Sequence, residues 1–171
     1  CFFQVNPGQN EQLIQRACSL AGDLSGKTVL DLYSGMGNFS IPLGLCGGAV
    51  TGIEGNLESV EWAKKNAALA EITARFFAAD VPGSLRQLAG DQERVDFILL
   101  DPPRTGIGKA AALLPELQPE KIIYISCDPA TLARDLGTLC DKGYHLVDLT
   151  PLDMFPQTSH IESVALLEKR G

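Results

Sequence analysis

Residues 28–38 have the sequence TVLDLYSGMGN, and this stretch decides the fold class. Its first part is a short apolar run that predicts a buried β-strand over residues 28–33. Gly35 and Gly37 follow at once, and glycines just past a strand allow a tight turn in which a ligand approaches bare backbone. A stretch over residues 39–45 then predicts a helix, so the region has the strand–turn–helix form with which a parallel sheet begins.

The same alternation continues along the chain. Strands are predicted over residues 28–33, 49–54, 74–79, 97–101, 121–126 and 144–149. Helices are predicted over residues 11–21, 39–45, 57–70, 82–89 and 129–142. Asn10 is the predicted N-cap of the first helix. These units indicate an α/β fold, a Rossmann-like, mostly parallel sheet with helices on both faces. A strand over 160–167 follows a loop without a helix, so it is expected to pair antiparallel with 144–149.

The composition fits one globular domain, since the chain has 171 residues and is 45% hydrophobic. The formal charge of −7 argues against a general nucleic-acid-binding surface, but not against an active site that handles one nucleotide. The five cysteines include no C-x-x-C pair, which disfavours a disulfide framework or a zinc site and favours the cytoplasm. Because the chain begins at Cys1 within structured sequence, we expect residues 1–171 to be one domain of a longer protein.

Acidic residues end three of the predicted strands, where ligands of open α/β sheets bind. Glu54 is placed to accept hydrogen bonds from the two hydroxyls of a ribose, Asp80 from an adenine amino group, and Asp101 ends the fourth strand. A dinucleotide is disfavoured because Ser40 replaces the third glycine of G-x-G-x-x-G. S-adenosylmethionine has a ribose and an adenine but no phosphate, so the pattern favours a methyltransferase.

Cys127 is the candidate nucleophile. It precedes Asp128 and Pro129, which suit the N-cap and first position of a helix, and the positive end of that helix favours the thiolate. The charge of Asp128 opposes thiolate formation, and on spacing alone an inert apolar filler is an equal interpretation of the cysteine. Glu162 near the start of the last strand is either solvated or, if partly buried, a base with a raised pKa.

A nucleophilic cysteine with a separate base is what methylation of a pyrimidine carbon requires. C5 of uracil is a weak nucleophile until a thiolate adds to C6, and a base must then remove the C5 proton so that the thiolate leaves. The sequence DPPR (101–104) stiffens a loop beside the cofactor. Arg104 stands where enzymes that methylate base amines usually have an aromatic residue, which argues against amine methylation.

Together these motifs resemble the catalytic domain of the RNA uracil-5-methyltransferases, which make 5-methyluridine in ribosomal or transfer RNA. The resemblance is carried by FFQVN (2–6), DLYSGMGNFS (31–40), Glu54, DPPRTG (101–106), SCDPATLARD (126–135) and DMFPQTSHIES (153–163). It implies that Cys127 is the nucleophile and Glu162 the base. It also implies S-adenosylmethionine as cofactor, no metal, and a seven-stranded sheet with an antiparallel last strand. The cofactor contacts that it implies are Gln4, Tyr33, Asn38, Glu54, Asp80 and Asp101.

The resemblance further implies an RNA substrate, with ribosomal RNA favoured over transfer RNA, and no membrane. The family's N-terminal RNA-binding module has no counterpart in these residues, so we expect the chain to bind cofactor but to methylate RNA poorly. Asp128 replaces the family's usual asparagine, which predicts a raised pKa for the Cys127 thiol. Two alternatives stay open: a methyltransferase for a base amine or a small molecule, and a non-catalytic cofactor-binding domain.

Overall fold

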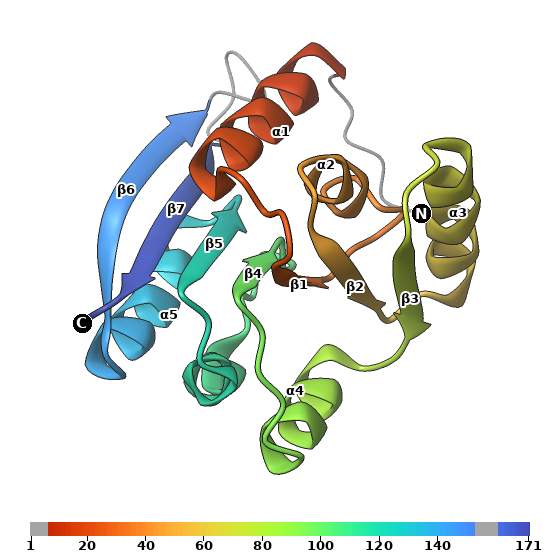
Figure 1. Cartoon of the computed structure of the whole chain (residues 1–171). Helices are drawn as coiled ribbons and strands as arrows, with labels where there is room; N and C mark the ends of the chain where they lie inside the picture. Colours follow the sequence, from red (N-terminus) through yellow and green to blue (C-terminus); the bar gives the residue numbers. More distant parts are fainter. Residues whose placement is uncertain (1–6, 153–160) are drawn as a thin grey trace.

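A seven-stranded sheet runs through the middle of the molecule (Figure 1). The structure is a computed structural model that describes residues 7–152 and 161–171. The strands are β1 (Thr28–Leu32), β2 (Ala49–Glu54), β3 (Ala74–Ala78), β4 (Phe97–Leu100), β5 (Lys121–Ser126), β6 (Tyr144–Leu152) and β7 (Glu162–Lys169). Their order across the sheet is β3-β2-β1-β4-β5-β7-β6. The chain therefore winds outward from β1 in both directions, as a doubly wound α/β fold does.

Helices pack on both faces of this sheet, as predicted. They are α1 (Pro7–Ala21), α2 (Ser40–Leu45), α3 (Leu57–Leu69), α4 (Val81–Gly90), the 3₁₀ helix η1 (Gly108–Leu117) and α5 (Pro129–Asp141). One core joins α1 and α2 to the sheet, and a second joins α4, η1 and α5 to its other side. Every residue of β4 is buried, which agrees with its continuous apolar sequence, typical of a strand that is covered on both faces. In the part of the chain described, none of the helices has the length and apolar character that a membrane span requires.

The last strand reverses direction, and this confirms the prediction for the end of the chain. β7 is inserted between β5 and β6 and pairs antiparallel with both. β6 is longer than predicted because it continues to Leu152, with an irregularity in its register between Leu146 and Asp148. Both strands thereby reach the edge of the sheet where β5 ends, and Glu162 begins β7 at that edge.

The start of α1 differs from the prediction. The helix begins at Pro7, and proline suits the first turn because its missing N–H would have no partner there. Asn10 consequently lies inside the helix and is not its N-cap. Its side-chain amide instead exchanges two hydrogen bonds with that of Asn38, at 2.9 and 3.0 Å. This pair ties α1 to the glycine turn after β1.

The helix η1 was not predicted. Its sequence GKAAALLPEL has a glycine at the start and Pro115 near the end, two signals typical of a loop. Burial outweighs these local preferences, because Ala111, Leu114 and Leu117 are fully enclosed between the sheet, α4 and α5. The segment therefore forms a tight 3₁₀ helix, because Pro115 would interrupt a regular α-helix.

Candidate active site

Cys127 and Glu162 are brought together at the carboxyl ends of the parallel strands. β5 and β7 pair antiparallel as far as Ser126 and Ser163, so Cys127 and Glu162 are the next two residues in register. The carboxylate of Glu162 interacts electrostatically with the Cys127 thiol. Antiparallel pairing of the last strand is therefore the feature that places the predicted base opposite the predicted nucleophile.

Glu162 is buried, with 6% of its surface exposed. Burial raises the pKa of its carboxyl group, since removal from water disfavours the charged form. This is the condition under which the sequence predicted a general base at this position. A solvated carboxylate at the end of the sheet, the other interpretation, does not agree with this burial.

Glu162 belongs to a group of three acidic residues, here called the carboxyl cluster: Asp31, Asp101 and Glu162. Side chains two residues apart on a strand point to the same face of the sheet. Each of the three acids lies two residues from a residue of the core beneath α1, and these core residues are, in the same order, Val29, Leu99 and Val164. They therefore share one face of the sheet. The pKa of Asp101 is raised well above its ordinary value by burial, and further by the charges of Glu162 and Asp31. Carboxyl groups whose charges affect one another in this way bind protons as a coupled set.

The pKa of the Cys127 thiol lies above its ordinary value, opposite to the direction that the helix end was expected to give. The main cause is burial, and the charge of Glu162 raises it further. A hydrogen bond from the Arg104 side chain and the positive charge of that residue act in the other direction. The effect of the helix end is thus outweighed by desolvation and by the neighbouring carboxylate.

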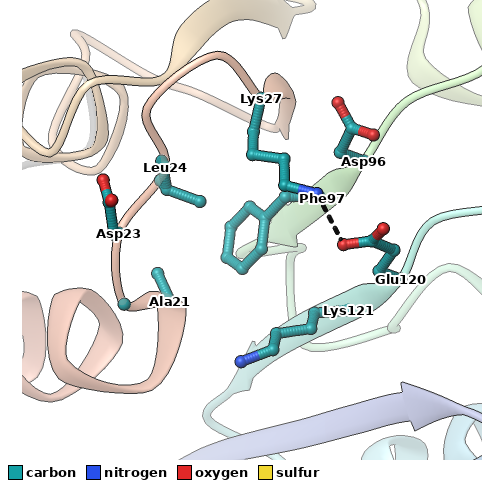
Figure 2. Close-up of a pocket in the computed structure, with 9 residues that line it drawn as sticks. Ala21, Asp23, Leu24, Lys27, Asp96, Phe97, Glu120 and Lys121 are labelled. Carbon is teal, nitrogen blue, oxygen red and sulfur yellow. Dashed lines mark hydrogen bonds and ion pairs between the residues drawn. The ribbon is translucent and has the colours of Figure 1, made fainter.

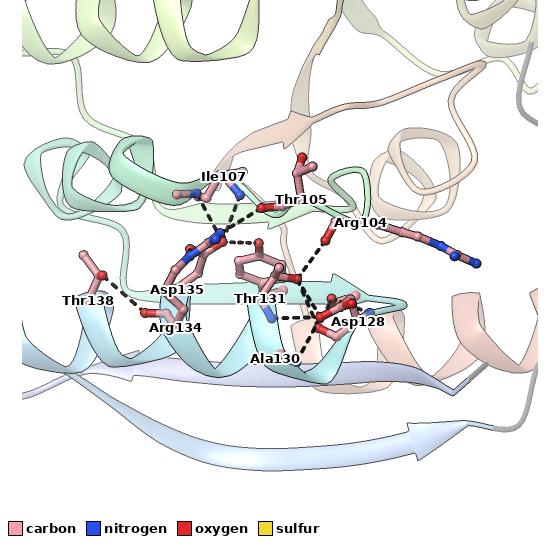
Figure 3. Close-up of polar contacts among 12 residues, drawn as sticks. Arg104, Thr105, Ile107, Asp128, Ala130, Thr131, Arg134, Asp135 and Thr138 are labelled. Atoms are coloured by element: carbon pink, nitrogen blue, oxygen red, sulfur yellow. Dashed lines mark hydrogen bonds and ion pairs between the residues drawn. The ribbon is translucent and has the colours of Figure 1, made fainter. Parts of the chain in front are cut away.

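Asp128 is the N-cap of α5, as predicted. Its Oδ1 accepts hydrogen bonds from the backbone N–H groups of Ala130 and Thr131, at 3.0 and 2.9 Å (Figure 3). These bonds, with that of Thr131 first, hold the pKa of the carboxyl group below its usual value. The raised thiol pKa that was attributed to Asp128 comes instead from burial and Glu162.

The glycine turn between β1 and α2 combines a left-handed backbone with buried polar atoms. Gly35 and Gly37 have φ angles of +54° and +90°, a region that favours glycine. At the base of the turn, Ser40 donates a hydrogen bond to Asp31 Oδ2. Asp31 Oδ1 and Ser34 Oγ are buried without a hydrogen-bond partner among the residues described.

The remaining predicted cofactor residues surround this turn. Glu54 Oε2 accepts a hydrogen bond from the N–H of Gly35 at 3.0 Å, so the acidic end of β2 faces the turn. Tyr33 has a left-handed φ of 62°, unusual for a residue with a large side chain. Burial is the main cause that raises the pKa of its hydroxyl. The negative charge of Asp80 raises this pKa further, and those of Asp135 and Glu54 have smaller effects in the same direction. Asp80 is also the N-cap of α4, through a 2.7 Å hydrogen bond from the N–H of Gly83.

The last two predicted contacts are Asn38 and Gln4. Asn38 lies in the same turn, and its amide is paired with Asn10. Gln4 lies outside the described residues, as does the stretch DMFPQTSH (153–160) of the last motif. The sequence did not identify the contact between Arg104 and Cys127. Its signal was the position of Arg104 in the loop after β4, at the carboxyl ends of the strands, where Cys127 also follows β5.

A separate pocket of about 180 Å³ lies at the amino ends of the parallel strands, opposite to the candidate active site (Figure 2). Its lining includes Asp96 and Glu120, which precede β4 and β5, and an ion pair of 2.9 Å joins Lys27 to Glu120 there. The amino ends of parallel strands are not where ligands of doubly wound folds bind. This pocket is therefore distinct from the candidate active site.

The strand order and the reversed β7 define a Rossmann-like fold of the S-adenosylmethionine-dependent methyltransferase class. The sequence profile described as tRNA (uracil-5-)-methyltransferase matches residues 1–170. The chain belongs to this family.

Individual relatives agree with this assignment. The chain is 42% identical to a 23S rRNA (uracil(1939)-C(5))-methyltransferase RlmD of Acinetobacter baumannii (strain AB0057), over 98% of this chain and 37% of that protein. It is 43% identical to the enzyme of the same name from Vibrio parahaemolyticus, over 98% of this chain and 38% of that protein.

A solved structure agrees as well. The crystal structure of Pyrococcus abyssi tRNA (uracil-54, C5)-methyltransferase in complex with S-adenosyl-L-homocysteine superimposes with a TM-score of 0.84. It is 35% identical, over 97% of this chain and 40% of that chain. The chain thus spans about two fifths of the length of the relatives it matches.

Proposed function

We propose that this chain is the catalytic domain of an enzyme that methylates C5 of a uridine in RNA, with S-adenosylmethionine as methyl donor. The observation that carries the proposal is that Cys127 and the buried Glu162 lie opposite each other, one position past the last pair of β5 and β7. A cysteine nucleophile beside a base of raised pKa suits addition and elimination at a pyrimidine ring. A methyltransferase for an amine needs neither residue.

The residues around the glycine turn fit the cofactor. Asp31 and Ser34 have buried oxygen atoms without a partner among the described residues, and the ammonium group of S-adenosylmethionine matches such a carboxylate. Glu54 and Asp80 are assigned to the ribose and the adenine, with Tyr33, Asn38 and Asp101 completing the described part of the site. Gln4 is proposed on the family motif. When bound, S-adenosylmethionine supplies a methyl group made electrophilic by its sulfonium.

Cys127 starts the proposed reaction. Its thiolate forms an Sγ–C6 bond with uracil, and the electron pair of the C5–C6 double bond moves toward O4, which makes C5 nucleophilic. Once C5 has received the methyl group, it carries one proton too many. Glu162 removes this proton, the C5–C6 double bond forms again, and Cys127 leaves as thiolate.

The burial of Glu162 suits this step. A carboxyl group whose pKa is raised binds a proton more strongly than a solvated one, which makes it a stronger base toward the weakly acidic C5 position. Its neighbour Asp101 has a still more strongly favoured neutral form, because burial and the charge of Glu162 both raise its pKa. The carboxyl cluster can therefore hold a proton on Asp101 while Glu162 stays available as the base.

Ribosomal RNA is the proposed substrate class. The two bacterial relatives that share 42% and 43% identity are named as 23S rRNA enzymes, whereas the archaeal tRNA enzyme shares 35%. With 14 Lys and Arg against 21 Asp and Glu, this domain has a net negative charge, which disfavours contact with RNA phosphates. We assign most of the RNA affinity to parts of the protein outside it, and we expect the protein to act in the cytoplasm.

An RNA hairpin containing 5-fluorouridine tests the proposal. Fluorine cannot leave C5 as a proton does, so the full-length protein with S-adenosylmethionine should form a stable protein–RNA adduct, visible as a shifted band in a denaturing gel. Cys127→Ala should abolish the adduct, and Cys140→Ala, at a partly buried cysteine of α5, should not.

Glu162→Gln supplies the second arm of the experiment. This variant should form an adduct with ordinary uridine RNA and release it slowly, because proton removal is blocked after the methyl group has been transferred. Methylation that persists in Cys127→Ala would contradict the proposal and favour a methyltransferase for another target.

A further inference from the structure

The loop that follows β4 is attached to α5 by side-chain hydrogen bonds (Figure 3). Thr131 Oγ1 donates to the carbonyl oxygen of Arg104 at 2.9 Å. One turn further along the helix, Arg134 Nη2 donates to the carbonyl oxygen of Thr105 at 2.8 Å. The first two turns of α5 therefore determine where the backbone of Arg104 lies.

Asp135 completes this attachment from inside the protein. Its side chain is fully buried, and Oδ2 accepts hydrogen bonds from the Tyr124 hydroxyl at 2.7 Å and from the backbone N–H of Ile107 at 2.8 Å. Arg134 Nε donates to its other oxygen at 2.9 Å. Burial alone would raise the pKa of Asp135, but the bonds from Arg134 and Tyr124 outweigh burial, so the group stays ionised. One buried carboxylate thus connects β5, α5 and the loop.

The same helix also carries the candidate nucleophile. Cys127 directly precedes the N-cap of α5, and the side chain of Arg104 is hydrogen-bonded to its thiol. The bonds from Thr131 and Arg134 hold the loop backbone at the start of α5, which keeps Arg104 within reach of the sulfur. Arg104 is itself exposed at the surface, so this contact is not needed to fill the core.

The charges that face Cys127 show that the Arg104 guanidinium can stabilise a thiolate. Glu162 approaches from β7, and its charge disfavours a negative charge on the sulfur. Asp128, the neighbour in sequence, directs its carboxylate to the N–H groups of α5. Within residues 7–152 and 161–171, the positive charge that acts on the sulfur is that of Arg104. A thiolate beside a base of the same sign requires such a counter-charge.

We propose that Arg104 is a catalytic residue that holds the Cys127 sulfur as a thiolate, in a position set by Asp135 and Thr131. The proposal rests on the function proposed above. The thiol proton passes to water, and Arg104 stabilises the resulting negative charge until the Sγ–C6 bond forms. In the elimination, Glu162 takes the C5 proton, the electron pair restores the C5–C6 double bond, and the sulfur departs as a thiolate that Arg104 again receives.

Alkylation of the cysteine tests this role without RNA or cofactor. The rate at which iodoacetamide modifies Cys127 is measured between pH 6 and pH 11 by mass spectrometry of the peptide, in the parent chain and in Arg104→Gln. An opposite charge hydrogen-bonded to a titrating group lowers or raises its pKa by about 1 unit or more, so the profile of Arg104→Gln should move to higher pH. Below its midpoint the variant should react about tenfold more slowly than the parent.

Two variants and one internal reference make the result specific. Arg104→Lys, which keeps the positive charge, should restore most of the rate, and Arg86→Gln, at an exposed arginine of α4, should superimpose on the parent. Cys140 should react equally in all variants. A profile of Arg104→Gln that superimposes on the parent, or an equal shift in Arg86→Gln, would overturn the assignment. A shift without the 5-fluorouridine adduct would refute the proposed function alone, and an adduct without a shift would refute the role of Arg104 alone.

Discussion

Asp31 illustrates, at the scale of one residue, how burial changes an acid. It lies in β1 with no exposed surface, and burial raises its pKa to about 7 although Ser40 donates a hydrogen bond to it. In the unfolded chain an aspartate has a pKa of about 3.9. Between these two values the folded state binds the additional proton, so the free energy of unfolding falls as the pH rises, by up to about 1.4 kcal/mol per pH unit.

We therefore expect Asp31→Asn to reduce the loss of stability between pH 5 and pH 8. Asparagine resembles the neutral acid and cannot ionise, so the variant should lose about 2–3 kcal/mol less than the parent over this interval. Urea unfolding at the two pH values measures the difference, with Asp91→Asn at an exposed carboxyl group as the control. Equal losses in the parent and in Asp31→Asn would show that Asp31 is already charged in the folded protein.

At the scale of elements, the contact between α5 and the loop after β4 depends on Gly106. This residue has a φ of +65°, and a Cβ atom there would overlap the Asp135 carboxylate and lie 2.7 Å from Arg134 Nη2. Gly106→Ala should lower the free energy of unfolding by about 2 kcal/mol or more, because it combines backbone strain with displacement of a buried carboxylate. Guanidinium unfolding measures this loss.

Gly137→Ala is the matched control for that measurement. Gly137 lies within α5, and a Cβ atom there would meet nothing within 4 Å. Alanine is the better helix former, so this variant should gain up to about 1 kcal/mol. If both variants changed stability in the same direction, the loop would not be held in the way that the hydrogen bonds indicate.

At the scale of the whole molecule, we expect this chain to bind the cofactor well but RNA weakly. The proposed cofactor site is formed within one sheet edge, whereas a formal charge of −7 disfavours contact with phosphates. The 171-residue chain should therefore bind S-adenosylhomocysteine in a calorimetric titration but methylate an RNA hairpin much more slowly than the full-length protein. Efficient turnover of the hairpin by the chain alone would contradict this expectation.

The sequence by itself determined the α/β class, the strands and most of the helices, since apolar runs, glycine turns and helix caps are local signals. It also located Glu54, Asp80 and Asp101 at strand ends, because the carboxyl ends of parallel strands share one edge of a sheet. Asp128 as an N-cap was predictable from its proline neighbour. The position of Asn10 inside α1 and the helix η1 were not, because packing overrode the local signals there.

Tertiary structure alone decided how the site is charged. The reversed β7 places Glu162 beside Cys127, and burial then raises both pKa values, which the helix end before α5 did not predict. The loop that carries Arg104 is likewise bonded to a buried carboxylate in another element, through the N–H of Ile107. Propensities and caps act over a few neighbouring residues, whereas desolvation and Coulomb interactions depend on distances that only the folded chain defines.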